Sequence, residues 1–435
     1  MTVRDIILVQ QRELRLALGE RYIGRDMRLP PGDTSIIRVI IGPRRAGKSF
    51  FAIHELAGSG TFGYVNFDDE RLCRLSDYDE IIAAVDSVYE KPETLLLDEV
   101  QNLPQWELFV NRLARQGYRL TITGSNSHLL SNELATHLTG RYLQTAILPF
   151  SFAEYLRLAP HELTTQEKAA AVFPYATAGG YPEPLVKQFA SRDYLATLFD
   201  AIVYKDIVKR YRIRSVKGIE DLAQYLLSNI ASEYSYQSLS RVTQNKSTMT
   251  AQKFVRYLEE AFLFFSVPRF SFKVREQAAS NKKIYCTDTG FVAARAFAVS
   301  ENRGKLLENL VAIGLWKRQL AGDASVYYWK SPQQEEVDFV VKQGNAITAL
   351  IQVCADLQDE KTRSREIRAL LKASRDLSCD NLIILSMQEE KTETSEWFGM
   401  TGTIRYVPLW KWLEEPAIGE PQRAGRARSP VQKKR

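Results

Sequence analysis

The residues best suited to chemistry in this sequence form a glycine-rich segment near its start. Residues 42–49 read GPRRAGKS, which has the spacing GxxxxGK[ST] and stands between a strand-like and a helix-like run. Glycines let backbone N–H groups close around phosphate oxygens, and the positive end of the following helix favours the same anion. In such a loop the lysine reaches the β- and γ-phosphates and the serine binds Mg²⁺. The candidate nucleotide ligands are Gly42, Pro43, Arg44, Arg45, Ala46, Gly47, Lys48 and Ser49; a glycine turn without a ligand is the alternative.

Two adjacent acids follow a run of leucines and would complete this site. Leu95–Leu97 predict a buried strand, and Asp98 and Glu99 stand at its carboxyl end. Asp98 is placed to hold Mg²⁺ with Ser49, whereas Glu99 would orient and deprotonate the water that attacks the γ-phosphate. An ordinary strand end is the other interpretation. Together with the glycine-rich segment, these acids predict ATP and Mg²⁺ as ligands and hydrolysis as the reaction.

Two further positions would sense or stabilise the γ-phosphate. The strand expected at 119–125 ends in polar residues, of which Asn126 is the candidate sensor and Ser125 the alternative; a turn-forming asparagine fits as well. Arg141 begins the next expected strand, where a neighbouring subunit would present it to ATP. An arginine there stabilises charge on the transferred phosphoryl group, although an ordinary surface arginine is the other interpretation.

The elements that would position these residues alternate between strands and helices. The expected strands are 36–41, 62–67, 94–100, 119–125 and 141–148, with helices at 77–90 and 106–117. This alternation is typical of a parallel sheet flanked by helices. The first 20 residues predict an amphipathic helix and lack the cleavage site of a signal peptide. We therefore expect residues 1–150 to form an α/β P-loop core with an N-terminal helix.

Three more units and a tail are expected after this core. Residues 151–215 lose the strand signals and predict a helical domain. Residues 216–298 predict a helix, a turn, a second helix and a hairpin, which is the order of a winged helix-turn-helix. Residues 299–414 return to an α/β pattern, with a first helix and strands expected at 325–331, 335–344, 346–355 and 381–386. Residues 415–435 have the composition of a disordered segment.

Five segments carry a family resemblance. They read GPRRAGKS, LLLDEVQNLPQWE, TITGSNSHLL, LTGRYLQTAILPFSFAEYL and GGYPE. Over roughly residues 35–355 the chain resembles a prokaryotic branch of the AAA+ ATPases whose C-terminal half was long treated as a domain of unknown function. The resemblance implies ATP hydrolysis coupled to conformational change, a helical lid at 151–215, and assembly into a ring, here expected to be a hexamer. It matches Lys48, Ser49, Asp98, Glu99 and Asn126 to the family's site positions, with Ser49 in place of a common threonine.

The second helix of the expected helix-turn-helix has a polar side that suits nucleic acid. Small polar residues and bases at a helix N-terminus suit phosphate or groove contact, and more bases follow on the expected wing. The candidate DNA-binding residues are Thr248, Lys253, Arg256, Lys273, Arg275, Lys282 and Lys283. A winged helix that contacts protein or packs a ring is the alternative. Bacterial branch-migration motors share this domain order, so branched DNA such as four-way junctions is the expected substrate.

Four residues of the last unit fall in the order of the restriction-endonuclease-like fold. They are Glu308, Asp338, Gln352 and Cys354. Related AAA+ proteins usually show Glu-Val-Lys where this chain has Gln-Val-Cys. In an active site the strand acid helps to bind Mg²⁺ and the lysine stabilises developing phosphate charge. The two replacements predict a domain without catalysis; an ATP-gated nuclease is the alternative.

Charge and cysteine content bear on the partners and the compartment. The 58 Lys and Arg exceed the 52 Asp and Glu by six, and the six bases of residues 421–435 account for this excess. DNA binding by the body of the chain would therefore depend on local asymmetry, and the tail would act as a flexible basic arm or simply as a solvated segment. The four cysteines are far apart, which favours a reducing cytoplasm and excludes a disulfide framework or zinc module.

These features lead to one main hypothesis and one alternative. The main hypothesis is a cytoplasmic, ring-forming AAA+ ATPase that binds and remodels or translocates DNA. No apolar run is long enough to span a bilayer, so no membrane association is expected. The alternative is a nucleotide-controlled signalling or defence switch that binds a protein, whose identity the sequence leaves open, through its C-terminal half.

Overall fold

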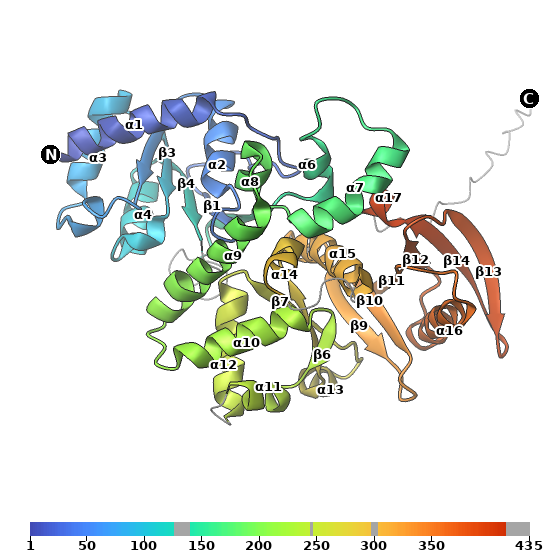
Figure 1. The fold of residues 1–435 in the computed structure, drawn as a ribbon. Coiled ribbons are helices and arrows are strands. Elements are labelled where there is room, and N and C mark those ends of the chain that lie inside the picture. The colour runs from blue at the N-terminus through green and yellow to red at the C-terminus, as the bar shows by residue number, and fades with distance from the viewer. Residues whose placement is uncertain (126–139, 244–246, 297–302, 415–435) are drawn as a thin grey trace, which may run out of the picture.

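The computed structural model of the chain describes residues 1–125, 140–243, 247–296 and 303–414. The α/β part at the N-terminus and the large sheet near the C-terminus lie at opposite sides of the molecule, with most of the helices between them (Figure 1). Asn126 and the basic tail 415–435 lie outside the described residues. Among the described helices, none is long and apolar enough to cross a membrane.

The N-terminal part contains a parallel sheet of five strands. The sheet order is β2-β3-β4-β1-β5, so β4 lies between β1 and β3. The predicted α/β fold with a parallel sheet is confirmed, and each strand is one to three residues shorter than predicted. The strand β3 ends at Asp98 because Glu99 turns the chain with a left-handed φ of 50°. The strands are β1 (Ile37–Ile41), β2 (Gly63–Asn66), β3 (Thr94–Asp98), β4 (Arg119–Gly124) and β5 (Tyr142–Ala146).

Helices cover this sheet and supply its core. The first helix begins with a capping box between Thr2 and Asp5, and it packs Ile6 and Ile7 toward the sheet. The N-terminal amphipathic helix is thus confirmed. The helical segments of this part are α1 (Val3–Gly19), α2 (Lys48–Ala57), η1 (Leu72–Arg74), α3 (Asp79–Tyr89), η2 (Val100–Asn102) and α4 (Trp106–Arg115).

The chain after β5 is helical as far as Lys209. Two segments approach closely at the start of this part, where the Phe150 N–H donates to the Gly180 carbonyl at 2.6 Å. A Cβ at Gly180 would lie 2.3 Å from the Phe150 oxygen, so glycine is required there. The segments are α6 (Phe152–Leu156), α7 (Thr165–Ala178), α8 (Pro182–Lys187), α9 (Ser191–Ala201) and the π-helical η4 (Ile202–Lys209).

A small antiparallel sheet with order β6-β8-β7 organises residues 216–296. The helix pair and the two later strands follow the predicted order, whereas β6 and α13 were not predicted. The short β6 has three residues, too few for a hydrophobic pattern to show. That this unit is a winged helix stays a prediction. Its elements are α10 (Val216–Ser228), β6 (Ser232–Tyr234), α11 (Tyr236–Val242), α12 (Thr248–Glu260), β7 (Phe264–Pro268), α13 (Val274–Ala279), β8 (Lys282–Cys286) and α14 (Thr289–Arg295).

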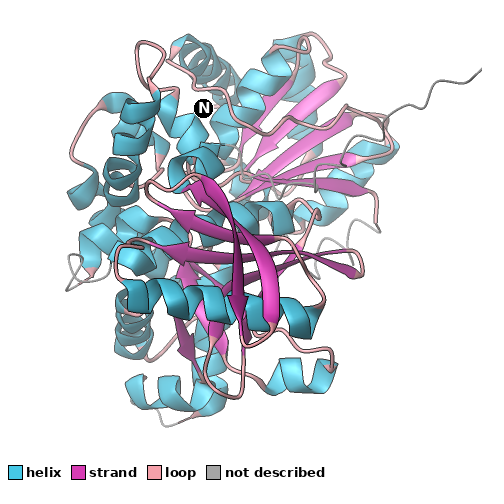
Figure 2. Cartoon of the chain, turned by 90° about the vertical axis from the view of Figure 1, so that its right-hand side faces the viewer, coloured by secondary structure: helices cyan, strands magenta, loops and turns pink. Residues whose placement is uncertain are grey.

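The C-terminal unit is a mixed sheet of six strands with order β13-β14-β12-β11-β10-β9. The strands β13 and β14 were not predicted, because β13 reads KTETSEW and has no apolar face at the sheet edge. The helix α16 lies across one face of the sheet (Figure 2). The elements are α15 (Arg303–Leu320), β9 (Ser325–Lys330), β10 (Glu336–Gln343), β11 (Ala346–Cys354), α16 (Glu360–Leu377), β12 (Leu382–Ser386), β13 (Lys391–Trp397), β14 (Met400–Pro408) and α17 (Leu409–Glu414).

One hydrophobic cluster joins the three units that follow the N-terminal core. It runs from Phe152 to Leu413 and includes Leu310 of α15, Ile284 of β8 and Ile351 of β11. The opposite face of the six-stranded sheet packs α16 in a separate cluster. The helical part, the three-stranded unit and the C-terminal sheet therefore share a continuous core.

Candidate nucleotide-binding site

The glycine-rich segment forms a loop between β1 and α2. Gly42 has a φ of +145°, and a Cβ there would lie 1.9 Å from the Ile147 carbonyl oxygen. Gly47 has a φ of +90° and occupies the position before the first turn of α2. Both values disfavour residues with a side chain, which explains the two glycines of the motif. The loop therefore ends on a helix N-terminus, where backbone N–H groups are available to an anion.

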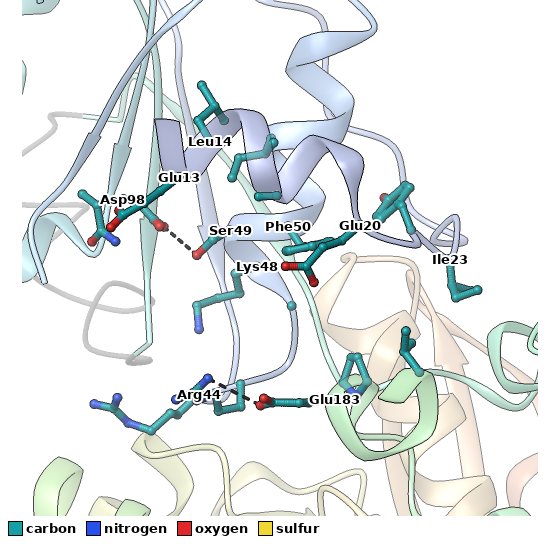
Figure 3. Close-up of a pocket in the computed structure, with 18 of the residues that line it drawn as sticks. Glu13, Leu14, Glu20, Ile23, Arg44, Lys48, Ser49, Phe50, Asp98 and Glu183 are labelled. Atoms are coloured by element: carbon teal, nitrogen blue, oxygen red, sulfur yellow. Dashed lines mark hydrogen bonds and ion pairs between the residues drawn. The ribbon is translucent and has the colours of Figure 1, made fainter. Parts of the chain in front are cut away.

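Ser49, in the first turn of α2, contacts Asp98 at the carboxyl end of β3. The Ser49 hydroxyl donates to Asp98 Oδ1 at 2.8 Å (Figure 3). Tyr64 donates to Asp98 Oδ2 at 3.1 Å. Thr123 of β4 also donates to Asp98. Burial, followed by the nearby Glu99 charge, raises the pKa of Asp98 to about 6. Two hard oxygen donors side by side fit Mg²⁺, which takes carboxylate and hydroxyl ligands together with phosphate oxygens.

Lys48 and Glu99 face the same space. The Lys48 ammonium donates to the Pro43 carbonyl at 3.0 Å and lies 3.8 Å from Glu99 Oε1. Ser125 donates to Glu99 Oε1 at 2.5 Å, and Gln101 donates to the other carboxylate oxygen. Burial alone would raise the pKa of Glu99, but the Lys48 charge and these hydrogen bonds lower it. The Glu99 carboxylate is therefore ionised, as a base must be.

Two arginines of the loop are tied to helices far along the chain. Arg44 makes two hydrogen bonds of 2.9 Å to the Asp206 carboxylate of η4. Arg45 pairs with Glu183 of α8 at 3.4 Å. The sequence did not predict the hydrogen bond between Ser125 and Glu99, and it did not predict that Asp206 pairs with Arg44. Glu183 stood within the quoted GGYPE segment, whereas no motif marked Asp206.

These residues line a pocket of about 550 Å³. Figure 3 shows Lys48, Ser49 and Asp98 on one side and Glu183 of α8 across from them. The pocket continues past the end of α1, where Tyr22 stacks on His54 with ring centroids 4.1 Å apart. The pocket thus extends from the glycine-rich loop to a wall of aromatic and apolar side chains.

Comparison with known proteins supports this description. Residues 34–156 match the sequence family described as AAA domain. An uncharacterized protein of Methanocaldococcus jannaschii is 33% identical over 420 residues, which is 92% of this chain and 92% of that protein. The chain belongs to the same family as this archaeal protein, and its N-terminal part is an AAA domain. Residues 170–302 and 303–412 match two domains of unknown function, DUF8612 and DUF4143.

The chain is also similar to two other proteins. An uncharacterized protein of Haemophilus influenzae is 27% identical over 332 residues, or 72% of this chain and 82% of that protein. Among solved structures, a Walker-type ATPase of Pyrococcus abyssi has a TM-score of 0.38 and 12% identity, covering 59% of this chain and 90% of that one.

Arg141 lies at the far end of the AAA-domain sheet from its own P-loop. The Ile37 N–H at the start of β1 donates to the Arg141 carbonyl at 2.9 Å, whereas the P-loop follows the end of β1. Five strand residues, or about 15 Å, separate the two. The Arg141 side chain is exposed. Arg141 therefore lies away from its own P-loop, and its action on a neighbouring subunit stays a prediction.

The DNA-binding candidates have different surroundings. Thr248, Lys253 and Arg256 are exposed on α12, although Arg256 pairs with Glu260 at 3.4 Å. On the expected wing, Arg275 is exposed, Lys282 is half-buried, and Lys273 is exposed and pairs with Glu276 at 2.8 Å. The prediction that Lys283 contacts DNA is wrong, because its side chain is 3% exposed and points into a cluster of carboxylates.

The four nuclease-like positions outside the AAA domain lie close together. The Asp338 carboxylate accepts a hydrogen bond from the Val353 N–H at 3.0 Å, and the side-chain oxygen of Gln352 accepts one from the Asp338 N–H at 3.2 Å. The Gln352 amide donates to Glu366, and the Cys354 thiol donates to the Asp356 carbonyl. Glu308 and Asp338 both contact Lys283. Within the described residues, no group of three or more His, Cys, Asp or Glu side chains is arranged to hold a metal ion.

Proposed function

We propose that this chain binds and hydrolyses ATP at the P-loop of its AAA domain. The observation that supports the proposal is that Lys48, Ser49, Asp98 and Glu99 converge at the carboxyl ends of β1 and β3. The loop amides and Lys48 would bind the phosphates. Ser49 and Asp98 would hold Mg²⁺, which neutralises phosphate charge when it is bound.

Glu99 would accept a proton from the attacking water. Ser125 and Gln101 hold its carboxylate, so the oxygen atoms keep a defined position. A triphosphate would attract the Lys48 ammonium away from Glu99, because it carries more negative charge than one carboxylate. The pKa of Glu99 would then rise, which makes it a stronger base. Asn126 or Ser125 would contact the γ-phosphate.

A substitution of Glu99 tests the reaction. Glu99→Gln should retain ATP affinity and reduce turnover by about 10² to 10⁴-fold, because general base catalysis contributes that much. Glu93→Gln, at a largely exposed carboxylate beside Arg119, is the matched control and should keep normal turnover. Phosphate release and nucleotide binding measure the two effects. Normal turnover in Glu99→Gln would contradict the proposal.

We further infer that ATP turnover acts on DNA held by α12, with residues 151–215 as a lid and residues 216–298 as a winged helix. The support is a direct connection between the P-loop and α12. Asp206 of η4 binds Arg44, and Tyr211 just after η4 stacks on Tyr257 of α12 at 3.8 Å. A change at the P-loop would therefore reach the helix that carries Lys253.

The DNA proposal is tested with several nucleic acids. Four-way junctions should stimulate phosphate release more than linear or single-stranded DNA and should give a gel shift at low salt. Lys253→Glu in α12 should weaken this shift, whereas Glu93→Gln should leave it unchanged. ATPase activity that no DNA affects, together with no gel shift, would exclude this function.

Assembly into a hexameric ring is part of the same proposal. Mixing Arg141→Ala with Glu99→Gln protein should restore some activity, because an intact interface then combines one subunit's Arg141 with the other's Glu99. Electron microscopy with an ATP analogue should show closed rings. No rescue in the mixture would exclude Arg141 as a residue that acts between subunits.

A protein-binding switch is the second candidate function. One observation favours it: the segment between β7 and β8 exposes Phe272 and Val274 at 74% and 81%. Exposed apolar side chains of this size favour protein contact over phosphate contact. Nucleotide-dependent binding of a protein, with turnover that is slow and independent of DNA, would support this candidate.

A further inference from the structure

The buried lysine of the three-stranded unit reaches into the C-terminal unit. Lys283 of β8 lies 2.9 Å from Glu308 of α15, and 2.6 and 3.1 Å from Glu336 and Asp338 of β10. The side chains of Lys283, Glu308 and Asp338 are 3%, 12% and 9% exposed. One ammonium therefore joins three carboxylates that come from two elements of the neighbouring unit.

Uncharged contacts join the same two units around this lysine. The Tyr285 hydroxyl of β8 donates to Glu308 at 2.7 Å. The buried Asn309 of α15 bonds both the N–H and the carbonyl of Cys286 at 2.8 Å. Together with the ion pairs of Lys283, these contacts come from three of the five residues of β8. The strand is therefore held against α15 along most of its length.

Carboxylates outnumber the ammonium groups in this region. Lys330 adds a second ammonium, which lies 3.6 Å from Glu336 and pairs with Glu233 of β6. Burial alone would lower the pKa of Lys283, but the surrounding carboxylates raise it well above its usual value. Burial, followed by the Asp338 charge, raises the pKa of Glu308 to about 7. Lys283 is therefore always charged, and the acids around it depend on that charge.

Most of the carboxylate oxygen atoms of the cluster contact protein donors. Asp338 uses Oδ1 for Lys283 and Oδ2 for the Val353 N–H, while Glu308 Oε1 accepts from Lys283 and Tyr285. Gln352, in place of an acid, donates to Glu366. A divalent cation would have to displace the ammonium and several hydrogen bonds before it could bind here.

We propose that Lys283 is a fixed internal counterion that clamps residues 303–414 onto residues 216–296 and closes their carboxylate cluster to divalent cations. Removing one partner from a buried ion pair leaves an uncompensated charge, whereas replacing all the charges with neutral groups of similar size costs little. The C-terminal unit and the three-stranded unit then move as one body.

Two variants of the full chain test the clamp through thermal unfolding. Lys283→Ala should lower the Tm by on the order of 10 °C, because it leaves buried carboxylates without their counterion. Lys283→Met combined with Glu308→Gln and Asp338→Asn should recover most of that loss. Lys282→Ala, at the half-buried neighbour on the same strand, is the matched control and should change the Tm little.

Hydrogen exchange and added metal complete the test. In Lys283→Ala, amides of both β8 and β10 should exchange faster, with no change in β1 to β5. Wild-type Tm should not respond to MgCl₂ or MnCl₂ through this cluster. An unchanged Tm in Lys283→Ala, equal losses in the single and triple variants, or faster exchange confined to β8 would overturn the proposal. A metal-dependent rise in Tm, or metal-dependent DNA cleavage, that Asp338→Asn abolishes would overturn it too.

Discussion

Two buried lysines of this molecule have opposite surroundings. Lys48 and Lys283 both have side chains 3% exposed. Lys48 has one carboxylate at 3.8 Å and otherwise contacts the Pro43 carbonyl and the Ser125 hydroxyl, whereas Lys283 has three carboxylates within 3.1 Å. Burial lowers the pKa of Lys48 despite Glu99 and Asp98, while the carboxylates around Lys283 raise its pKa.

The comparison teaches what makes a buried lysine available to a ligand. Lys48 faces a pocket of about 550 Å³ and has too little negative charge nearby, so an incoming phosphate improves its surroundings. Lys283 already has more carboxylates than it can neutralise. We therefore propose that the number of close acids distinguishes a buried lysine that is available to an anion from one that holds two units together.

The largest effect on ATP affinity should come from removing Lys48, and removal of Lys283 is the comparison. Lys48→Ala should weaken ATP binding on the order of 1000-fold, or about 4 kcal/mol, because two charge-assisted bonds to phosphate are lost. Lys283→Ala should leave the Kd within about twofold. A fluorescent ATP analogue measures both. Equal losses would mean that the two lysines do not have separate roles.

A buried carboxylate with amide partners extends the comparison. Asp288 accepts the N–H groups of Gly180 and Gly290 at 2.7 and 2.8 Å, and burial raises its pKa to about 7. A raised pKa means that this group stabilises the fold when protonated, so stability falls as the pH rises through 7. The loss should be about 3 kcal/mol between pH 5 and pH 8.

Asp288→Asn should flatten this pH dependence, because the neutral amide does not titrate. Denaturant unfolding at a series of pH values measures the slope. Asp323→Asn is the control, because Asp323 is an exposed acid just after α15. This variant should keep the wild-type slope. A slope in Asp288→Asn equal to that of the wild type would assign the titration to other carboxyl groups, such as Asp98 and Glu308, whose pKa values are also raised.

A new acid beside Lys48 should make it resemble Lys283. Ser125 Oγ lies 3.3 Å from the Lys48 ammonium, so Ser125→Asp would add a second close carboxylate. ATP binding should weaken by about tenfold or more, because the new charge competes with phosphate for the lysine. Ser125→Ala should change ATP affinity by less than Ser125→Asp. Equal ATP affinity in the two variants would contradict the idea that nearby acids make Lys48 less available to phosphate.

The smallest effect is expected from the Arg44 pair. Asp206→Asn removes the charge that holds Arg44, and it should change the KM for ATP by a few-fold, because a partly exposed ion pair contributes about 1 kcal/mol. Glu183→Gln, which alters the neighbouring pair with Arg45, is the comparison variant. A loss as large as that of Lys48→Ala would give Arg44 a direct role in phosphate binding.

Much of the AAA domain could be predicted from local patterns. The strand, glycine-rich loop and helix around residues 42–49 follow from backbone preferences that adjacent residues express. The acids after Leu97 stand at the end of a strand that hydrophobicity alone reveals. The order of strands in space was not predictable in this way, and it is what places Thr123 and Ser125 of the β4 region beside Asp98 and Glu99.

Other features had no local signal. Asp206 is 162 residues from its partner Arg44, and β13 has a polar sequence that pairing with β14 alone makes a strand. Long-range partners of this kind depend on packing, which neighbouring residues do not encode.

The sequence by itself determined where phosphate can be bound, since the required glycines, lysine and serine lie within eight adjacent residues. It also determined that Lys282 and Lys283 carry charge and point to opposite faces of β8, because side chains alternate along a strand. Only the tertiary structure decided which of these two faces meets Glu308, Glu336 and Asp338. The physical reason is that a side chain's charge is a local property, whereas its solvent exposure and its partners depend on what packs against it.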